Sequence, residues 1–314
     1  MLSANINYMN IEKNISLKKY TTFKIGGPAE YFADVKNIAD LQEVLEWAKE
    51  NKQPIKILGG GSNMLISDTG LKGLVIKLSL DKLEFNDNKV IVGPGVMLAY
   101  LLNMAIRNGL TGLEFAAGIP GTVGGATRGN AGTYGIAMDS VIKSIKYLDE
   151  NLNSQEMPAS EAQFAYRHSI FKEKAWIILE LSIELEKGDI KASQALIKER
   201  LEYRQNTQPN LPSAGCIFKN ILFENVDIEG LKAKNIEIEK FDKFKKIPAA
   251  YIIERAGLKG HKIGDAQISE LHANYIVNNG QATAEQVIML ISFIKQQVRD
   301  KYGVQLQEEV QLLV

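Results

Sequence analysis

The sequence has 314 residues, in which 37 lysine and arginine residues balance 37 aspartate and glutamate residues, so it lacks the strongly basic composition of a nucleic-acid-binding protein. The single cysteine, Cys216, excludes an internal disulfide, and three scattered histidines, at positions 168, 261 and 272, argue against a histidine-rich metal site. The first ten residues lack the features of a signal peptide and no apolar run approaches the roughly 20 residues of a membrane span, so we expect a cytoplasmic protein.

The first part of the chain alternates short strands, helices and glycine turns. Residues 20–28 predict a strand that ends in a turn, and Asp40 with Glu43 predicts the capped start of a helix. A strand over 55–58 leads directly into Gly59–Asn63, a turn of the kind that directs backbone N–H groups at phosphate. Further predicted elements are strands over 74–78 and 90–92 and a helix over 98–108, which Gly109 ends.

The densest glycine stretch of the chain runs from Gly118 to Gly135, with glycines at 118, 121, 124, 125, 129, 132 and 135. Each glycine costs roughly 0.5–1 kcal/mol in a helix or strand, so we expect sharp turns and a close approach of the backbone to a ligand, with a diphosphate as the usual guest. The alternative is a flexible surface loop. Neither glycine cluster has the spacing of a Rossmann or P-loop motif, so a nucleotide is indicated without a standard nucleotide motif.

The second part of the chain contains the clearest helix. Strands are predicted over 141–148 and 179–186, a charged helix over 191–205, a proline-rich break over 207–212 and a tight turn into a strand over 212–220. The lysine- and glutamate-rich residues 225–246 predict a solvated surface excursion. Thr283 and Gln286 form a capping box for a long helix that ends at Gly303, and a strand over 304–314 is expected to follow.

Several segments, in this order along nearly the whole chain, resemble those of the UDP-N-acetylenolpyruvoylglucosamine reductase family. They are Thr21–Ala29, Gly59–Asn63, Gly118–Ala126, Tyr166–Ser169, Ser213–Asn220, Gly257–Gly260, Ala266–Asn278 and Gly303–Val310. The resemblance implies an α+β fold with a two-part FAD-binding region of the vanillyl-alcohol-oxidase type, over residues 1–82 and 83–205, followed by a smaller α+β substrate-binding domain over 206–314.

The resemblance also implies a reaction. NADPH reduces FAD and leaves, and UDP-N-acetylglucosamine enolpyruvate is then reduced to UDP-N-acetylmuramate, a peptidoglycan precursor. The hydride passes from flavin N5 to C3 and the proton from Cys216 to C2. A monomer without a metal, nucleic-acid or membrane partner is expected.

The same resemblance places Arg167, Cys216 and Glu309 at the catalytic positions. An arginine suits charge that develops on a carboxylate, and a thiol with a reference pKa of about 8.5 is protonated at neutral pH and can donate a proton. The spacing Gly-Val-x-Leu-x-x-Glu-Val selects Glu309 over Glu308. Without these motifs, a surface ion pair, a small buried hydrophobe and an exposed carboxylate would be the ordinary interpretations of the three residues.

Two further sets of site residues follow from the resemblance. The expected FAD-binding residues are Gly59, Gly60, Gly61, Ser62, Asn63, Gly118, Pro120, Gly121, Thr122, Gly124 and Gly125. The expected substrate-binding residues are Tyr134, Tyr166, Arg204, Gln208, Lys219 and Asn220.

The chain departs from the family at Ile221, where proline is usual, and in the charged residues 225–246, which are additional. Two alternatives remain at this point. The first is another FAD-dependent oxidase of the same fold, which the absence of histidine and cysteine from both glycine clusters disfavours. The second is a non-catalytic flavin-binding regulator, in which the three catalytic residues could be replaced without loss of function.

Overall fold

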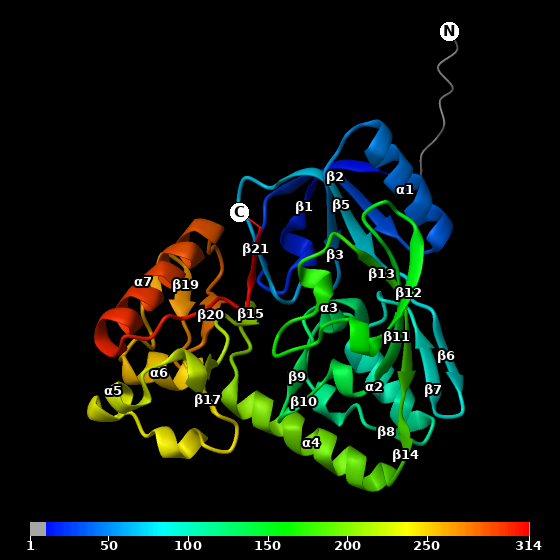
Figure 1. The fold of residues 1–314 in the computed structure, drawn as a ribbon. Coiled ribbons are helices and arrows are strands. Elements are labelled where there is room, and N and C mark those ends of the chain that lie inside the picture. The colour runs from blue at the N-terminus through cyan, green and yellow to red at the C-terminus, as the bar shows by residue number, and fades with distance from the viewer. Residues whose placement is uncertain (1–10, 314) are drawn as a thin grey trace. The chain divides into compact units, whose positions relative to one another are not determined.

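The computed structural model describes residues 11–313, which form two compact units of mixed helix and strand (Figure 1). The first unit comprises residues 11–15, Ala29–Gly60 and Lys72–Arg204, and the second comprises Ser16–Pro28, Gly61–Leu71 and residues 205–313. This content confirms the predicted α+β class. The signal-peptide prediction lies outside the described residues. Within residues 11–313, no helix is long and apolar enough to cross a lipid bilayer.

A four-stranded sheet begins the first unit. Its strands, in spatial order, are β1 (Glu12–Ser16), β2 (Pro28–Val35), β5 (Leu71–Leu78) and β3 (Ile55–Leu58). Strands β3 and β5 are parallel, with Ile55 opposite Leu74. Helix α1 (Ile38–Glu50) shares one apolar cluster with this sheet, to which it contributes Leu41, Val44, Leu45 and Ala48. The first glycine turn therefore follows directly from a strand, β3, whose sheet is packed against α1.

The start of α1 differs from the prediction. The cap is Asn37, whose Oδ1 accepts a hydrogen bond from the backbone N–H of Asp40 at 2.9 Å and whose Nδ2 donates to the Asp40 carboxylate at 2.7 Å. The predicted cap at Asp40 with Glu43 was wrong because Asn37 and Asp40 offer the same polar spacing one turn earlier.

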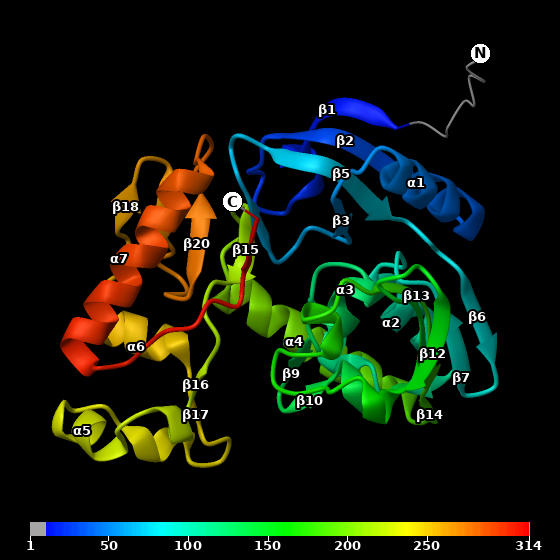
Figure 2. The same ribbon diagram turned by 45° about the horizontal axis from the view of Figure 1, so that its top comes forward.

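A five-stranded sheet forms the rest of the first unit, and its neighbouring strands are antiparallel. The strands, in spatial order, are β12 (Ser154–Pro158), β11 (Ile142–Leu148), β13 (Ile177–Glu184), β7 (Lys89–Val92) and β6 (Leu83–Asn86). Helices α2 (Leu98–Arg107) and α3 (Val123–Arg128) pack on one face of the sheet (Figure 2). The remaining elements are the pairs β8 (Leu110–Thr111) with β14 (Glu186–Lys187) and β9 (Gly132–Thr133) with β10 (Ile136–Ala137), and helix α4 (Ile190–Thr207).

The second unit is built on a sheet in the order β15 (Ser213–Cys216), β20 (Tyr275–Asn278), β19 (Ala266–Ile268) and β18 (Lys262–Ile263). The long helix α7 (Ala284–Tyr302) lies along this sheet (Figure 1), with the predicted capping box of Thr283 and Gln286 and with Gly303 in the left-handed conformation at its end. Two smaller pairs are β4 (Met64–Ile66) with β21 (Gln311–Leu313), and β16 (Ile221–Leu222) with β17 (Lys246–Ile247). Helices α5 (Ile228–Ala233) and α6 (Ala249–Arg255) complete the unit.

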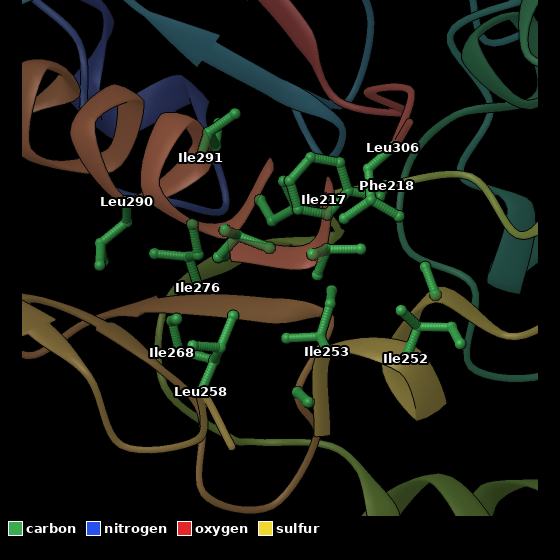
Figure 3. Packing of buried hydrophobic residues seen from close by; sticks show 14 of the residues in the cluster. Ile217, Phe218, Ile252, Ile253, Leu258, Ile268, Ile276, Leu290, Ile291 and Leu306 are labelled. Atoms are coloured by element: carbon green, nitrogen blue, oxygen red, sulfur yellow. The ribbon is translucent and has the colours of Figure 1, made fainter. Parts of the chain in front are cut away.

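One apolar core holds these elements together. Figure 3 shows Leu290 of α7 pointing toward the sheet that carries Ile268 and Ile276, with Ile291, Ile217 and Phe218 in the same cluster. Ile217 and Phe218 directly follow Cys216 in the sequence, so burial of their side chains fixes the segment that carries the predicted proton donor.

Three predictions for this unit were wrong. Residues 225–246 are not a purely solvated excursion, because they form α5 and bury Leu231, Ile236 and Ile238 in the common core. The predicted strand over 20–28 is absent: Leu17–Tyr20 is a single 3-10 turn, and extended pairing starts only at Pro28. The predicted strand over 304–314 is reduced to β21, since the residues before it make only an isolated bridge between Glu308 and Phe218.

Candidate flavin and catalytic site

The two glycine clusters meet in the first unit. A Cβ atom placed on Gly60 would lie 2.6 Å from the Cα of Gly121, and one placed on Gly59 would lie 2.8 Å from the Oγ1 of Thr122. Both distances are shorter than any side chain tolerates, so glycine is required where the turn after β3 packs on the turn before α3. Gly124 is likewise required, because a Cβ atom placed on it would lie 2.5 Å from the Cβ of Pro94. The structure thus brings together residues that the sequence separates by about sixty positions.

One glycine in this region is not explained by packing of the chain on itself. Gly125 is exposed, has no positive φ, and a Cβ there would meet only the Thr122 Oγ1, at an ordinary 3.6 Å. Nothing in the chain forbids a larger residue at this position, whereas a group bound closely against the backbone would. The exposed Gly118 and Pro120 lie on the same stretch. The glycine residues therefore fit a tightly held nucleotide cofactor such as FAD.

The remaining predicted flavin residues, Gly61, Ser62 and Asn63, fall in the second unit. Gly61 has a φ of +61°, and a Cβ there would lie 1.9 Å from the carbonyl oxygen of Tyr20, so its own turn demands glycine. Asn63 donates from Nδ2 to the carbonyl oxygen of Glu309 at 3.2 Å. Asn63 thereby ties its own turn to the segment before β21 that carries the predicted catalytic glutamate.

Arg167 lies in a strained turn of the first unit. It adopts a left-handed φ of 58°, and reciprocal backbone hydrogen bonds between Ala165 and His168 close the turn around it. Its Nη1 donates to the carbonyl oxygen of Gly132 at 3.0 Å, while Lys172 Nζ donates to the Arg167 carbonyl oxygen at 2.8 Å. Such conformations persist where the surroundings over-determine them, and they gather at functional sites. The turn holds the guanidinium of Arg167 against the second glycine stretch.

Two further residues belong to this region: Tyr166, next to Arg167 in the sequence, and Arg128, on the glycine stretch. The guanidinium carbon of Arg167 lies 5.4 Å from the centre of the Tyr166 ring. The carbonyl oxygen of Arg128 accepts a hydrogen bond from the Ser169 hydroxyl at 2.8 Å. Burial lowers the pKa of Arg128 below its usual value, although an arginine stays charged at any physiological pH. Arg128 therefore contributes a permanent positive charge to this stretch.

Cys216 and Glu309 are brought together within the second unit. Cys216 ends β15 opposite Tyr275, after a register shift at Gly215, whose φ is +75°. The backbone N–H of Glu309 donates to the carbonyl oxygen of Ile217 at 2.7 Å, so the segment before β21 lies against the residue after Cys216. This neighbourhood joins residues that are far apart in sequence and that the sequence analysis selected separately.

The neighbouring carboxylate, Glu308, has a different environment. Its Oε1 accepts from Lys295 Nζ of α7 at 2.6 Å, and both side chains are partly buried. The ion pair thus commits the Glu308 carboxylate to α7, whereas the backbone of Glu309 is bonded to the Cys216 segment. This geometry supports the predicted register.

The other predicted substrate residues are distributed over both units. Lys219 donates its backbone N–H to the Gln307 carbonyl oxygen at 2.9 Å, and Asn220 Oδ1 accepts from the backbone of Ala249 at 3.3 Å, so both continue the Cys216 segment. Tyr134 is 53% exposed at the tip of the β9–β10 hairpin, and Arg204 lies against Gly118. Gln208, a partly buried residue, follows α4.

Sequence reasoning assigned no role to Asn274, which organises the Cys216 segment. Its carbonyl oxygen accepts from Ile217 N–H at 2.8 Å, its Oδ1 accepts from Phe218 N–H at 3.0 Å, and its Nδ2 donates to the Phe218 carbonyl oxygen at 2.8 Å. Asn274 is 2% exposed, and a buried amide satisfied in this way is a strong constraint on local geometry. No local signal in the sequence marked this asparagine, because its side-chain partner, Phe218, lies 56 residues away.

Comparisons with known proteins match both parts of the chain. A family model described as "FAD binding domain" matches residues 29–151, and one described as "UDP-N-acetylenolpyruvoylglucosamine reductase, C-terminal domain" matches residues 207–313. A UDP-N-acetylenolpyruvoylglucosamine reductase of Anoxybacillus flavithermus is 39% identical, covering 100% of this chain and 97% of the relative. One of Caldanaerobacter subterraneus is 38% identical, covering 96% of this chain and 92% of the relative.

A solved structure agrees with the sequence relatives. The crystal structure of UDP-N-acetylenolpyruvylglucosamine reductase (MurB) from Thermus caldophilus superposes with a TM-score of 0.77 at 30% identity, covering 97% of this chain and 99% of that chain. Full-length similarity at this level, together with the glycine and Cys216–Glu309 arrangements, places the chain: it belongs to the UDP-N-acetylenolpyruvoylglucosamine reductase family.

Proposed function

We propose that this chain reduces UDP-N-acetylglucosamine enolpyruvate to UDP-N-acetylmuramate with FAD as cofactor and NADPH as hydride donor, and that Arg167, Cys216 and Glu309 carry the reaction. The observation that carries the residue assignment is the hydrogen bond that sets Glu309 beside the Cys216 segment, with Glu308 committed elsewhere. The family relationship supports the reaction itself.

The residues that would hold FAD in the first unit are those of the two glycine turns: Gly59, Gly60, Gly118, Pro120, Gly121, Thr122, Gly124 and Gly125. When bound and reduced by NADPH, the flavin would supply the hydride that one carbon of the enolpyruvyl double bond accepts. The glycine residues contribute close backbone approach, which no other residue would permit. The roles of Gly61, Ser62 and Asn63 in the same task remain predictions.

Three side chains of the protein stabilise the developing charge and supply the proton. As one alkene carbon gains a hydride, negative charge develops on the other carbon and on its carboxylate. A guanidinium stabilises that charge, which is the role we assign to Arg167. The Cys216 thiol then gives its proton to the second carbon and completes the saturated product. We assign to Glu309 a hydrogen bond to the enol form of the substrate carboxyl group.

Further proposals concern ligands and surroundings. Lys219, Asn220, Tyr134, Tyr166, Arg204 and Gln208 are proposed substrate contacts. We also propose that the protein acts as a cytoplasmic monomer without nucleic-acid partners. The division at residues 82 and 205 is likewise a proposal, for the parts that bind FAD and substrate and not for parts that fold independently.

The test separates the two halves of the reaction by the flavin spectrum. Under anaerobic conditions, NADPH should bleach the yellow protein, and the enolpyruvyl sugar nucleotide should restore its colour. In Cys216→Ala and Glu309→Gln, NADPH should still bleach the flavin as in the wild type. The recovery of colour with the substrate should slow by about 10²- to 10⁴-fold, the range for loss of a general acid. Glu308→Gln is the matched control and should recover at nearly the wild-type rate. Undiminished recovery in both catalytic variants would refute the assignment, and a protein that takes up no FAD would refute the function.

A further inference from the structure

Helix α4 (Ile190–Thr207) carries charged side chains on the same face that it packs against the rest of the first unit. Ser193 is buried and donates to the Glu114 carboxylate at 2.6 Å, and Ile197 packs against the apolar core of the first unit. Steps of three and four residues continue this face to Arg200 and Arg204. The packed face of the helix therefore ends in two arginines instead of aliphatic residues.

Both arginines lie over the second glycine stretch, in the same unit. The guanidinium carbon of Arg200 is 4.7 Å from the centre of the Tyr134 ring. A Cβ on Gly118 would approach the Cδ of Arg204 to 2.5 Å. Arg167 reaches the stretch from a third direction, through its hydrogen bond to Gly132. Permanently charged groups thus converge on one segment of backbone, where repulsion between them is relieved by a bound anion.

Arg200 also has a group that the protein leaves unsatisfied. Its Nη1 is buried, and within residues 11–313 it has no hydrogen-bond partner. A buried donor without an acceptor is destabilising, and native proteins retain one mainly where a ligand or another group completes it. The contact with the Tyr134 ring restricts where the Arg200 guanidinium, and with it the unsatisfied donor, can lie.

We propose that Arg200 is an anion-binding residue that holds a phosphate oxygen of a nucleotide ligand, oriented by the ring of Tyr134. This inference rests on the proposed function, because all three nucleotides of that reaction carry a diphosphate. The planar guanidinium matches two phosphate oxygens at once. The carboxylate of the substrate is already assigned to Arg167, which leaves phosphate as the anion for Arg200.

The experiment compares Arg200 with a cation on the outer face of the same helix. Arg200→Met removes the charge and keeps a long apolar side chain, and Arg200→Lys keeps the charge without the planar fork. Lys198→Met is the matched control, since the Lys198 side chain is 78% exposed and pairs only loosely with Glu202, at 3.8 Å. For each FAD-loaded protein we would measure the flavin content, the dissociation constants of NADP⁺ and UDP from changes in the flavin spectrum, and the KM for NADPH and for the sugar nucleotide.

Arg200→Met should weaken the binding of one nucleotide by about 10- to 100-fold, the range for a lost hydrogen bond to a charged group. The affinity of Arg200→Lys should lie between those of Arg200→Met and the wild type. Lys198→Met should change each constant less than about twofold, the range of an exposed, weakly paired charge. A selective effect on NADPH and NADP⁺, on UDP and the sugar nucleotide, or on flavin content identifies which phosphate Arg200 binds.

Two results would overturn the inference: constants and flavin content unchanged in Arg200→Met, or an equal loss in Lys198→Met. Should Arg200→Met fail to fold, Arg200→Gln provides the same comparison with a neutral polar side chain. A wild-type protein that binds UDP and NADP⁺ but does not turn over would refute the proposed function, while the binding constants would still decide the role of Arg200.

Discussion

At the scale of single residues, His272 couples proton uptake to the segment that carries Cys216. Burial lowers the pKa of the His272 ring below its usual 6.5. Its Nδ1 accepts a hydrogen bond from the Asn274 backbone at 3.3 Å, which only an unprotonated nitrogen can do. Asn274 in turn holds Ile217 and Phe218, so the neutral form of His272 supports the predicted proton-donor segment.

The lowered pKa of His272 predicts the direction in which stability changes with pH. Because the pKa is lower in the folded chain, the unfolded chain takes up the additional proton as the pH falls below about 6.5. The contribution to stability is fully present above that pH and is lost below it. We expect the urea midpoint to fall between about pH 8 and pH 5.5, and His272→Gln to reduce this slope. His261→Gln, at an exposed ring, should keep the wild-type slope. An identical pH slope in wild type and His272→Gln would contradict the coupling.

Residues whose role depends on strand period were predictable, and those whose partners are remote were not. The alternation of an extended chain selected Glu309, and the ion pair of Glu308 with Lys295 agrees with that register. Asn274 was missed because its partner, Phe218, is 56 residues away in the sequence. No local pattern distinguishes a buried, satisfied amide from one in a turn.

At the scale of elements, local signals succeeded where they were unopposed. The capping box at Thr283 and the left-handed Gly303 fixed both ends of α7. Two overlapping polar spacings competed at α1, and the earlier one was used. In residues 225–246 the many charges concealed a buried stripe, since pairs such as Lys232 with Glu229 lie on the exposed side of α5.

That stripe makes the excursion a structural part of the second unit. Leu231 is 1% exposed within the shared core, so Leu231→Ala should lower the free energy of unfolding by about 2–5 kcal/mol. Lys243→Ala, at an exposed position of the same segment, should stay within about 0.5 kcal/mol of wild type. Urea denaturation of both variants measures the difference. Equal stabilities would restore the interpretation of a solvated loop.

At the scale of the whole molecule, the second unit is assembled from both ends of the sequence. Phe23, Ile25 and Leu65 are buried in the core that residues after 205 otherwise form. Asn278 donates from Nδ2 to the Phe23 carbonyl oxygen at 3.1 Å, across 255 residues of sequence. A proline-rich break near residue 207 was a reasonable boundary for the chain, but sequence patterns carry no information on which distant segments share a core.

This assembly predicts that residues 206–314 will not fold alone, although a family model matches nearly this range. The fragment lacks strand β4, the parallel partner of β21, and exposes the core surface that Phe23 and Leu65 cover. We expect it to show no cooperative thermal transition. In the full chain, Phe23→Ala should destabilise by about 3–5 kcal/mol, because a fully buried ring leaves a cavity. Differential scanning calorimetry of the fragment, with the intact chain as reference, tests this. A cooperative transition in the fragment would show instead that residues 206–314 fold without the N-terminal segments that carry Phe23 and Leu65.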